Sequence, residues 1–210
     1  MRITMSSADF RRVRANVPRF LMAALSVALL SACVKWNNTN MTGTLPRLAF
    51  TMTRARDGKT VTAKDYHGKV VLLYFGYSFC TDVCPRTLSS IADVLKDMKS
   101  KAADVRVLFV TVDPKRDTLA VLKRYESLFG PQFDALRGTP DELAALAKRY
   151  RVSYTVAPAQ DGRPYDVTHS SAVYAFARDG RIRLLLSKLS GDKPDIAGTA
   201  ADLSRLVGGE

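Results

Sequence analysis

Two cysteines and one histidine have the side chains best suited to metal or redox chemistry in this chain. Cys80 and Cys84 are separated by three residues; they follow an apolar run at 70–75 and precede an amphipathic helical pattern. Two thiolates are soft ligands that suit copper(I), and His169 adds an imidazole, a harder ligand that helps copper(II) more. The set therefore predicts either a copper site or a redox-active thiol pair.

Apolar residues along the chain alternate between strand-like runs and helix-like spacings. Continuous apolar runs at 70–75 and 105–111 are typical of strands buried on both faces of a sheet. Hairpins are expected where strand-like runs flank Asp57-Gly58 and Asp179-Gly180. Predicted helices begin near Pro85, Leu119, Pro140 and Pro194.

The order of these elements places parallel crossovers first and an antiparallel hairpin last. It predicts an α/β, thioredoxin-like fold: a central mixed sheet flanked by helices, with an N-terminal β-hairpin. In such a sheet the loop with the two cysteines leaves the carboxyl end of strand 70–75. An antiparallel strand at 172–177 begins at the same edge, so we expect His169 to face Cys80 and Cys84.

Cys84 is expected at or next to the N-cap of the helix that begins at Pro85. The unsatisfied N–H groups and the dipole of a helix N-terminus stabilise a thiolate, so a lowered pKa is predicted for this thiol. Three residues between the cysteines, rather than two, leave room for an ion and still allow a disulfide. A purely structural disulfide is the alternative, but closing so short a loop constrains little of the unfolded chain.

Several residues near the predicted site are candidates for supporting roles. Asp82 lies inside the cysteine loop, where it either orients a ligand or occupies a plain turn. Asp113 ends the second buried strand, where it either supports the site or caps the turn before the next helix. Tyr77 and Phe79 flank the thiols and either limit access of water or pack as ordinary aromatic residues. His67 is interpreted as a surface residue.

The first 32 residues are interpreted as an export signal. Several arginines precede the apolar run 20–30, which is shorter than the ~20 residues that span a bilayer. Leu30-Ser31-Ala32-Cys33 resembles a bacterial lipobox, in which the cysteine becomes the lipidated N-terminus. We therefore predict a signal peptide (1–32), a lipidated Cys33 with a flexible tether (33–44) and a domain (45–210). An ordinary cleavage site with a free Cys33 is the alternative.

This interpretation places the protein on the periplasmic side of a bacterial cell envelope, anchored in a membrane by Cys33. The net charge is +12, and removal of residues 1–32 takes away five Arg and one Asp and leaves +8. A basic surface attracts anionic headgroups or an acidic partner, but a solvated surface with excess Lys and Arg is the simpler interpretation. Basic blocks interleaved with aromatic residues are missing, which argues against nucleic acid binding.

The motifs together resemble those of the Sco/SenC family from about residue 48 to the C-terminus. They are Phe75-Gly-Tyr-Ser-Phe-Cys80-Thr-Asp-Val-Cys84-Pro85, Val112-Asp-Pro-Lys-Arg-Asp117, Tyr150-Arg-Val152 and Thr168-His-Ser170, followed by Asp179-Gly180. The combination of C-x-x-x-C-P, V-D-P-x-R-D and a late His-Ser is highly specific.

The resemblance implies that Cys80, Cys84 and His169 are the ligands of one copper ion per chain, as copper(I), copper(II) or both. It also implies a membrane-tethered protein that helps to build the binuclear copper site of cytochrome c oxidase. The copper-site subunit of that oxidase and other copper chaperones are then the expected partners.

The sequence departs from the family pattern in three ways. The family usually has proline where Thr81 stands and aspartate where Thr168 stands, and Asp166 is the candidate that replaces the missing aspartate near the histidine. The family's commoner anchor is a transmembrane segment rather than a lipid signal.

Two functions fit these residues. The first is a copper metallochaperone, an assembly factor rather than a turnover enzyme. The second is a thiol–disulfide oxidoreductase that reduces the cysteines of the target copper site. His169 favours the first function, because a dithiol reductant does not require an imidazole. A thiol peroxidase is disfavoured, because Tyr77-Ser-Phe-Cys80 lacks the context of a peroxidatic cysteine.

Overall fold

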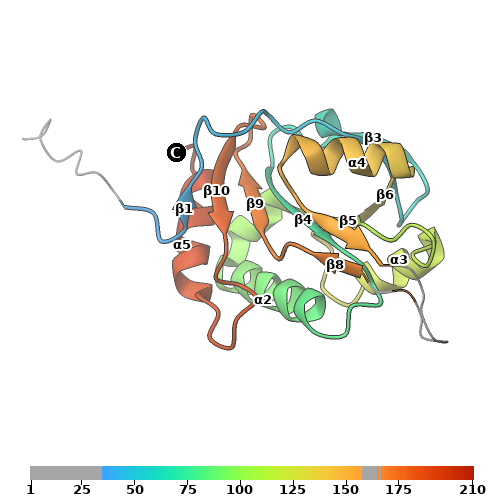
Figure 1. Cartoon of the computed structure of the whole chain (residues 1–210). Helices are drawn as coiled ribbons and strands as arrows, with labels where there is room; N and C mark the ends of the chain where they lie inside the picture. Colours follow the sequence, from blue (N-terminus) through green and yellow to red (C-terminus); the bar gives the residue numbers. More distant parts are fainter. Residues whose placement is uncertain (1–34, 158–164, 166) are drawn as a thin grey trace, which may run out of the picture. The chain divides into compact units, whose positions relative to one another are not determined.

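An eight-stranded mixed sheet forms the centre of the structure, a computed structural model that describes residues 35–157, 165 and 167–210 (Figure 1). Its strands in chain order are β1 (Thr39–Asn40), β2 (Thr51–Arg54), β3 (Thr60–Thr62), β4 (Val70–Gly76), β5 (Val105–Thr111), β6 (Phe133–Arg137), β9 (Val173–Phe176) and β10 (Ile182–Leu186). They lie side by side in the order β1-β10-β9-β4-β5-β6-β2-β3. A separate two-stranded sheet pairs β7 (Tyr154–Val156) with β8 (Val167–His169).

Helices cover both faces of the large sheet. They are α2 (Val83–Asp97), α3 (Leu119–Glu126), α4 (Pro140–Arg149) and α5 (Ile196–Val207), with short 3-10 turns η1 (Ala63–Tyr66) and η2 (Lys99–Asp104). Helix α4 begins at a capping box in which Thr139 and Glu142 bond each other's backbone N–H groups. Figure 1 shows α2 and α4 on opposite sides of the sheet.

Strand β4 shows why the sheet is buried on both faces. Val70, Leu72 and Tyr74 belong to the hydrophobic cluster beneath α2 and α5. Val71, Leu73 and Phe75, at the alternating positions, belong to the cluster beneath α4. An unbroken apolar run is therefore needed, since successive side chains of a strand point to opposite faces.

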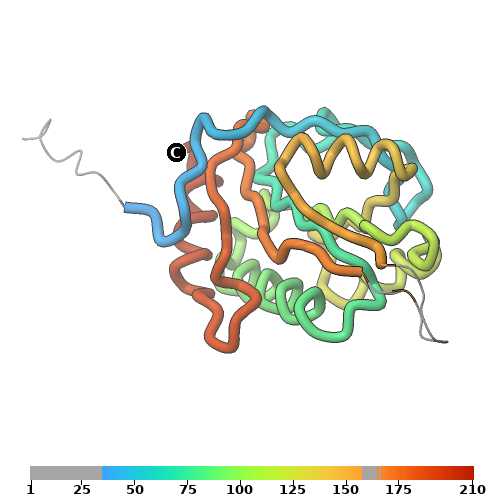
Figure 2. The backbone as a smooth tube through the Cα atoms, viewed as in Figure 1, coloured from blue at the N-terminus to red at the C-terminus, as the bar shows by residue number. Residues whose placement is uncertain are grey.

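The topology confirms the predicted thioredoxin-like fold. Strands β4, β5 and β6 are parallel, whereas β9 is antiparallel to both β4 and β10. In the backbone tube of Figure 2, the orange segment of β9 lies beside the blue-green segment of β4, although the two are far apart in the chain. The predicted N-terminal hairpin is β2–β3, and the predicted C-terminal hairpin is β9–β10.

The segment before the predicted domain boundary is packed rather than free. Strand β1 pairs with β10 and forms the edge of the sheet. Asp202 of α5 accepts hydrogen bonds from the backbone and side-chain N–H groups of Asn37 and Asn38 at 2.8–3.2 Å. The predicted flexible tether (33–44) is therefore too long at its C-terminal end, because the compact unit begins at Trp36. Cys33 and the predicted signal peptide lie outside the described residues.

Residues 36–210 form a compact unit with both hydrophobic faces of the core and all the strand pairs of the sheets. A fragment that begins at Trp36 thus keeps every stabilising contact described above. Among the described residues, no helix combines the length and the apolar character that crossing a bilayer requires.

Candidate metal centre

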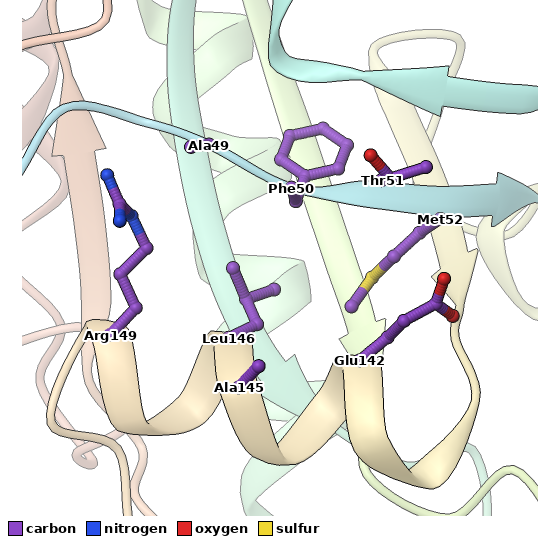
Figure 3. Close-up of a pocket in the computed structure, with 8 residues that line it drawn as sticks. All are labelled: Ala49, Phe50, Thr51, Met52, Glu142, Ala145, Leu146 and Arg149. Atoms are coloured by element: carbon purple, nitrogen blue, oxygen red, sulfur yellow. The ribbon is translucent and has the colours of Figure 1, made fainter.

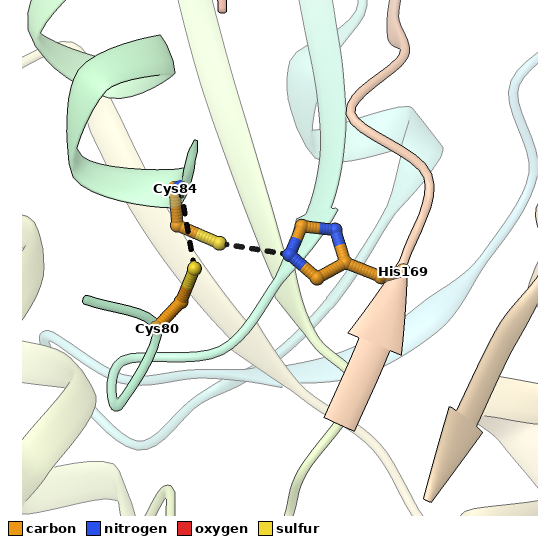
Figure 4. Close-up of side chains that lie close together, drawn as sticks. All are labelled: Cys80, Cys84 and His169. Atoms are coloured by element: carbon orange, nitrogen blue, oxygen red, sulfur yellow. Dashed lines mark hydrogen bonds between the residues drawn. The ribbon is translucent and has the colours of Figure 1, made fainter. Parts of the chain in front are cut away.

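Cys80, Cys84 and His169 meet at one edge of the sheet, as the sequence predicted (Figure 4). The sulfur atoms of the two cysteines and a ring nitrogen of His169 all lie within 4.8 Å of one another. Both cysteines are free thiols. Cys80 lies in the loop after β4, Cys84 in the first turn of α2, and His169 at the end of β8, just before β9. Elements from two distant parts of the chain thus form the cluster.

Cys84 is the buried member of the cluster. Its side chain has 0% exposure and lies in the core beneath α2. Gly76, the last residue of β4, makes room for it: a Cβ atom at Gly76 would stand 2.8 Å from the Cys84 sulfur and 2.6 Å from the Phe109 ring. Only glycine fits at this position without displacing the thiol or the ring.

Burial determines the protonation of this thiol. The prediction that the helix N-terminus lowers the pKa of Cys84 is wrong, because desolvation raises it to about 12, against an opposing hydrogen bond with the backbone of Tyr77. Helix α2 also begins two residues earlier than predicted, at Val83 rather than Pro85, so Cys84 lies inside its first turn. Without a metal, the Cys84 thiol therefore keeps its proton at neutral pH.

His169 is oriented to present one ring nitrogen to that thiol. Its Nδ1 lies 3.0 Å from the backbone carbonyl oxygen of Ser170, and its Nε2 lies 3.0 Å from the Cys84 sulfur. Because a carbonyl oxygen only accepts hydrogen bonds, Nδ1 carries the proton, and Nε2 accepts from the thiol. Desolvation also lowers the pKa of His169 and favours the neutral ring, which is the form that binds metals. A metal ion can replace the thiol proton between these two atoms.

Asp117 holds the loop that carries Cys80, a role that the sequence analysis did not assign to it. It is fully buried, and its carboxylate accepts hydrogen bonds from the backbone N–H of Ser78 (3.0 Å), the Ser78 hydroxyl and the Thr111 hydroxyl (2.5 Å). The loop is thereby tied to the end of β5. The motif V-D-P-x-R-D contained the signal, since a charged residue so close to a buried strand requires partners.

A second cluster joins Asp113 to the histidine through an arginine. Asp113 is buried, forms an ion pair with Arg116 and accepts a 2.6 Å hydrogen bond from the Tyr165 hydroxyl. The Arg116 guanidinium carbon lies 4.1 Å from the ring centre of Tyr165 and 5.5 Å from that of Tyr77. The Tyr77 ring contacts His169 edge-on at 5.8 Å. Asp113 thus supports the site indirectly.

The other predicted supporting residues lie differently. Asp82 is exposed and forms an ion pair with Arg86 at 3.0 Å, so its carboxylate is engaged away from the thiols. Thr168 points away from the cluster and shares a 2.6 Å hydrogen bond with Thr155 of β7. Asp166 lies outside the described residues. His67 is exposed, as predicted.

A cavity elsewhere on the surface lacks these functional groups. About 280 Å³ in volume, it lies between β2 and α4 and contains neither cysteine nor histidine (Figure 3). Its acidic residue, Glu142, is engaged in the capping box of α4. The thiol cluster is therefore the better candidate for chemistry.

Alkylation of the reduced protein with iodoacetamide at pH 8 should distinguish the two thiols. We expect Cys80 to react at least ~10-fold faster than Cys84, because Cys84 is buried and its raised pKa leaves little thiolate. Peptide mapping by mass spectrometry measures both rates, and unfolding in urea should make them equal. Equal rates in the folded protein would contradict the described burial.

Substitution Asp117→Asn should loosen the cysteine loop. The amide N–H₂ would face the N–H and hydroxyl donors of Ser78 and Thr111, so we expect a loss of about 1–3 kcal/mol in the free energy of unfolding. Faster alkylation of Cys84 should accompany it. Urea denaturation checks the first effect, with Asp97→Asn at an exposed position of α2 as the matched control. If both variants are as stable as the parent, Asp117 does not anchor the loop.

Comparison with known proteins places this arrangement in a family. The family model described as SCO1/SenC matches residues 43–206. The chain is 37% identical to the mitochondrial SCO2 homolog of Bos taurus and 36% identical to the mitochondrial SCO1 homolog of Homo sapiens, each over 125 residues. That stretch is 59% of this chain in both cases, but only 47% and 42% of those relatives, so the chain spans about half their length.

A solved structure gives the same result at the level of the fold. ScoI of Bradyrhizobium japonicum, solved with copper bound, is 39% identical and superposes with a TM-score of 0.67. The match covers 76% of this chain and 98% of that one. Since the family model matches well over half of the residues, the chain belongs to the SCO1/SenC family.

Proposed function

We propose that this protein is a copper metallochaperone that binds one copper ion through Cys80, Cys84 and His169. The observation that carries the proposal is the convergence of two sulfur atoms and one imidazole nitrogen within 4.8 Å. Two thiolates satisfy copper(I), and the imidazole adds the harder ligand that copper(II) needs. The copper bound to the 39% identical ScoI supports the same assignment.

The residues of the site fit a copper ion that is carried as cargo. Cys80 is partly exposed, whereas Cys84 is fully buried, so one ligand is open to an exchange partner and the other secures the ion. Phe79, which precedes Cys80 in the chain, is 52% exposed. Binding releases the Cys84 proton, because a thiol must be deprotonated to act as a ligand. His169 is already neutral and oriented.

The recipient that we propose is the binuclear copper site of cytochrome c oxidase, with the copper-site subunit of that enzyme as partner. This step rests on the family motifs in the sequence. We further propose that residues 1–32 are a signal peptide, and that a lipidated Cys33 anchors the protein on the periplasmic side of a bacterial membrane. The Leu30–Cys33 sequence supports this anchor.

A thiol–disulfide oxidoreductase is the second candidate, because the same two sulfur atoms lie close enough for a small movement to join them. The backbone N–H of Cys84 already points at the Cys80 sulfur at 3.4 Å. The buried, protonated Cys84 thiol counts against rapid exchange by that residue, and the well-oriented His169 has no role in it. A reductase function that accompanies copper transfer uses Cys80 as the accessible thiol.

Replacement of Cys80 by serine should abolish tight copper(I) binding. A hydroxyl is a poor ligand for a soft ion, so the variant would retain a single sulfur. An anaerobic competition titration of the 36–210 fragment measures affinity and stoichiometry, with Thr81→Ala in the same exposed loop as the control. Undiminished binding of one copper(I) by Cys80→Ser would rule this site out.

Replacement of His169 by alanine should separate copper(II) from copper(I). Copper(I) accepts two sulfur ligands alone, so we expect a modest loss of its affinity. Loss of even a supporting residue near a metal costs ~10–100-fold, so the copper(II) affinity should fall at least that far, with altered charge-transfer absorption. His67→Ala is the matched control, since His67 is the other histidine of the chain and is exposed.

The same variant tests which function is dominant. Dithiol–disulfide exchange should survive in His169→Ala, because both thiols remain. Wild-type copper(II) spectra and affinity would show that His169 is not a ligand. Full support of oxidase assembly by a His169→Ala protein that binds neither copper(I) nor copper(II) tightly would favour the reductase over the chaperone.

Intact-mass analysis of the membrane fraction tests the proposed anchor. We expect a mature chain that begins at Cys33 and carries added acyl mass, because the preceding residues fit a lipobox. Cys33→Ser should abolish the modification and leave the thiol cluster intact. A mature N-terminus at another residue, or an unmodified Cys33, would overturn the anchor.

A further inference from the structure

The packed N-terminal segment leaves only a short connection to the proposed lipid. Asn37 and Asn38 are fixed to Asp202, so residues 34 and 35 alone separate Cys33 from the compact unit. Three residue steps span at most about 11 Å. If Cys33 is lipidated, as proposed above, Trp36 must lie close to the headgroup region of the bilayer. The surface around Trp36 is then the surface that faces the membrane.

That surface is basic and surrounds the single tryptophan of the chain. The guanidinium carbons of Arg205 and Arg183 lie 3.8 Å and 5.5 Å from the Trp36 ring centre. Arg183 also lines an open cavity of about 460 Å³ together with Arg47 and Arg181, and its lining includes no acidic residue. We call these four arginines, with Trp36, the basic face.

The charges on the basic face are only partly neutralised within the protein. Arg205 pairs with Glu210 and Arg181 with Asp179. Arg47 and Arg183 form no ion pair within the described residues, and Arg47 instead donates to the backbone carbonyl of Asp179 at 2.7 Å. Arginine binds phosphate through a planar fork of N–H donors, and tryptophan favours the interface between headgroups and acyl chains. The basic face therefore has the composition of a surface that contacts anionic lipid.

The position of the basic face leaves the metal centre free. Strand β10 runs in the same direction as β4, because both are antiparallel to β9. Arg181 and Arg183 lie at the start of β10, so they are at the opposite end of the sheet from the cysteine loop, which follows the carboxyl end of β4. The seven residues of β4 span about 23 Å. Trp36 precedes the edge strand β1, which β10 and β9 separate from β4, so the thiols lie outside the basic face.

We propose that the basic face docks on the headgroups of anionic phospholipids and leaves the copper ligands outside the contact with the membrane. A solvated excess of positive charge was the simpler interpretation from composition alone. The clustering of arginines around Trp36, next to the chain end that leads to Cys33, favours a lipid surface over an acidic protein.

Binding of the metal-free 36–210 fragment to vesicles tests the proposal. Trp36 is the only tryptophan, so its fluorescence reports on the basic face alone. We expect phosphatidylglycerol-containing vesicles with brominated acyl chains to quench this fluorescence, and pure phosphatidylcholine vesicles to leave it unchanged. Binding should weaken as salt is added, since salt screens exposed charges.

Substitutions identify the residues responsible. Each cation near an anionic surface contributes about fivefold in binding, so Arg47→Gln combined with Arg183→Gln should reduce vesicle affinity about 25-fold. Lys123→Gln combined with Arg124→Gln, at exposed positions of α3, removes the same charge elsewhere and should change it little. Copper(I) stoichiometry should be unchanged in both variants, and cooperative thermal unfolding should show that both are folded.

Several results would overturn the proposal. These are equal binding to phosphatidylcholine vesicles, equal losses in the two double variants, or displacement by glycerol phosphate at the concentration of lipid headgroups. The last result would mean that the cavity binds free phosphate rather than a membrane. The fragment lacks Cys33, so its vesicle binding is independent of lipidation. An unmodified Cys33 in cells would contradict the anchor and leave this result intact.

Discussion

The burial of the Cys84 sulfur is the constraint on which the rest of the site depends. A sulfur at zero exposure needs space in the core, and Gly76 at the end of β4 provides it. A buried thiolate without a counterion is unfavourable, so the thiol stays protonated until a cation arrives. His169 accepts the thiol hydrogen in the meantime. A soft cation can therefore take the place of the thiol proton between Cys84 and His169 with little rearrangement.

Two buried acidic residues, Asp113 and Asp117, support the metal ligands indirectly. Asp117 fixes the loop of Cys80 through Ser78, and Asp113 fixes Arg116, which stacks near Tyr77 and so supports the ring of His169. Both acids come from the turn after β5, the parallel neighbour of β4. The segment 113–117 therefore helps to position both Cys80 and His169, which come from distant parts of the chain. Of the two thiols, Cys80 is the partly exposed one, and His169 is partly exposed as well.

Much of this arrangement could be predicted from the sequence, because its signals were local. The apolar run 70–75, the capping box at Thr139 and the turn at Asp179-Gly180 each specify an element by themselves. The meeting of His169 with the cysteines followed from strand directions. The pKa of Cys84 could not be predicted, since desolvation depends on the tertiary packing of Gly76, Phe109 and α2, and it outweighs the helix terminus. The same holds for β1 and its contacts with Asp202, because residues 37 and 38 look like polar linker until α5 is placed beside them.

The insertion of β9 between β4 and β10 has a consequence for the order in which the site forms. The two thiols are close neighbours in every conformation of the chain, whereas the imidazole is 85 residues from Cys84. Closing so long a loop is entropically costly and comes late in folding. A newly synthesised chain therefore presents a two-sulfur site before a three-ligand one. Until β8 and β9 are in place, the two thiols can bind a soft cation, or be joined in a disulfide by an external oxidant, without the imidazole.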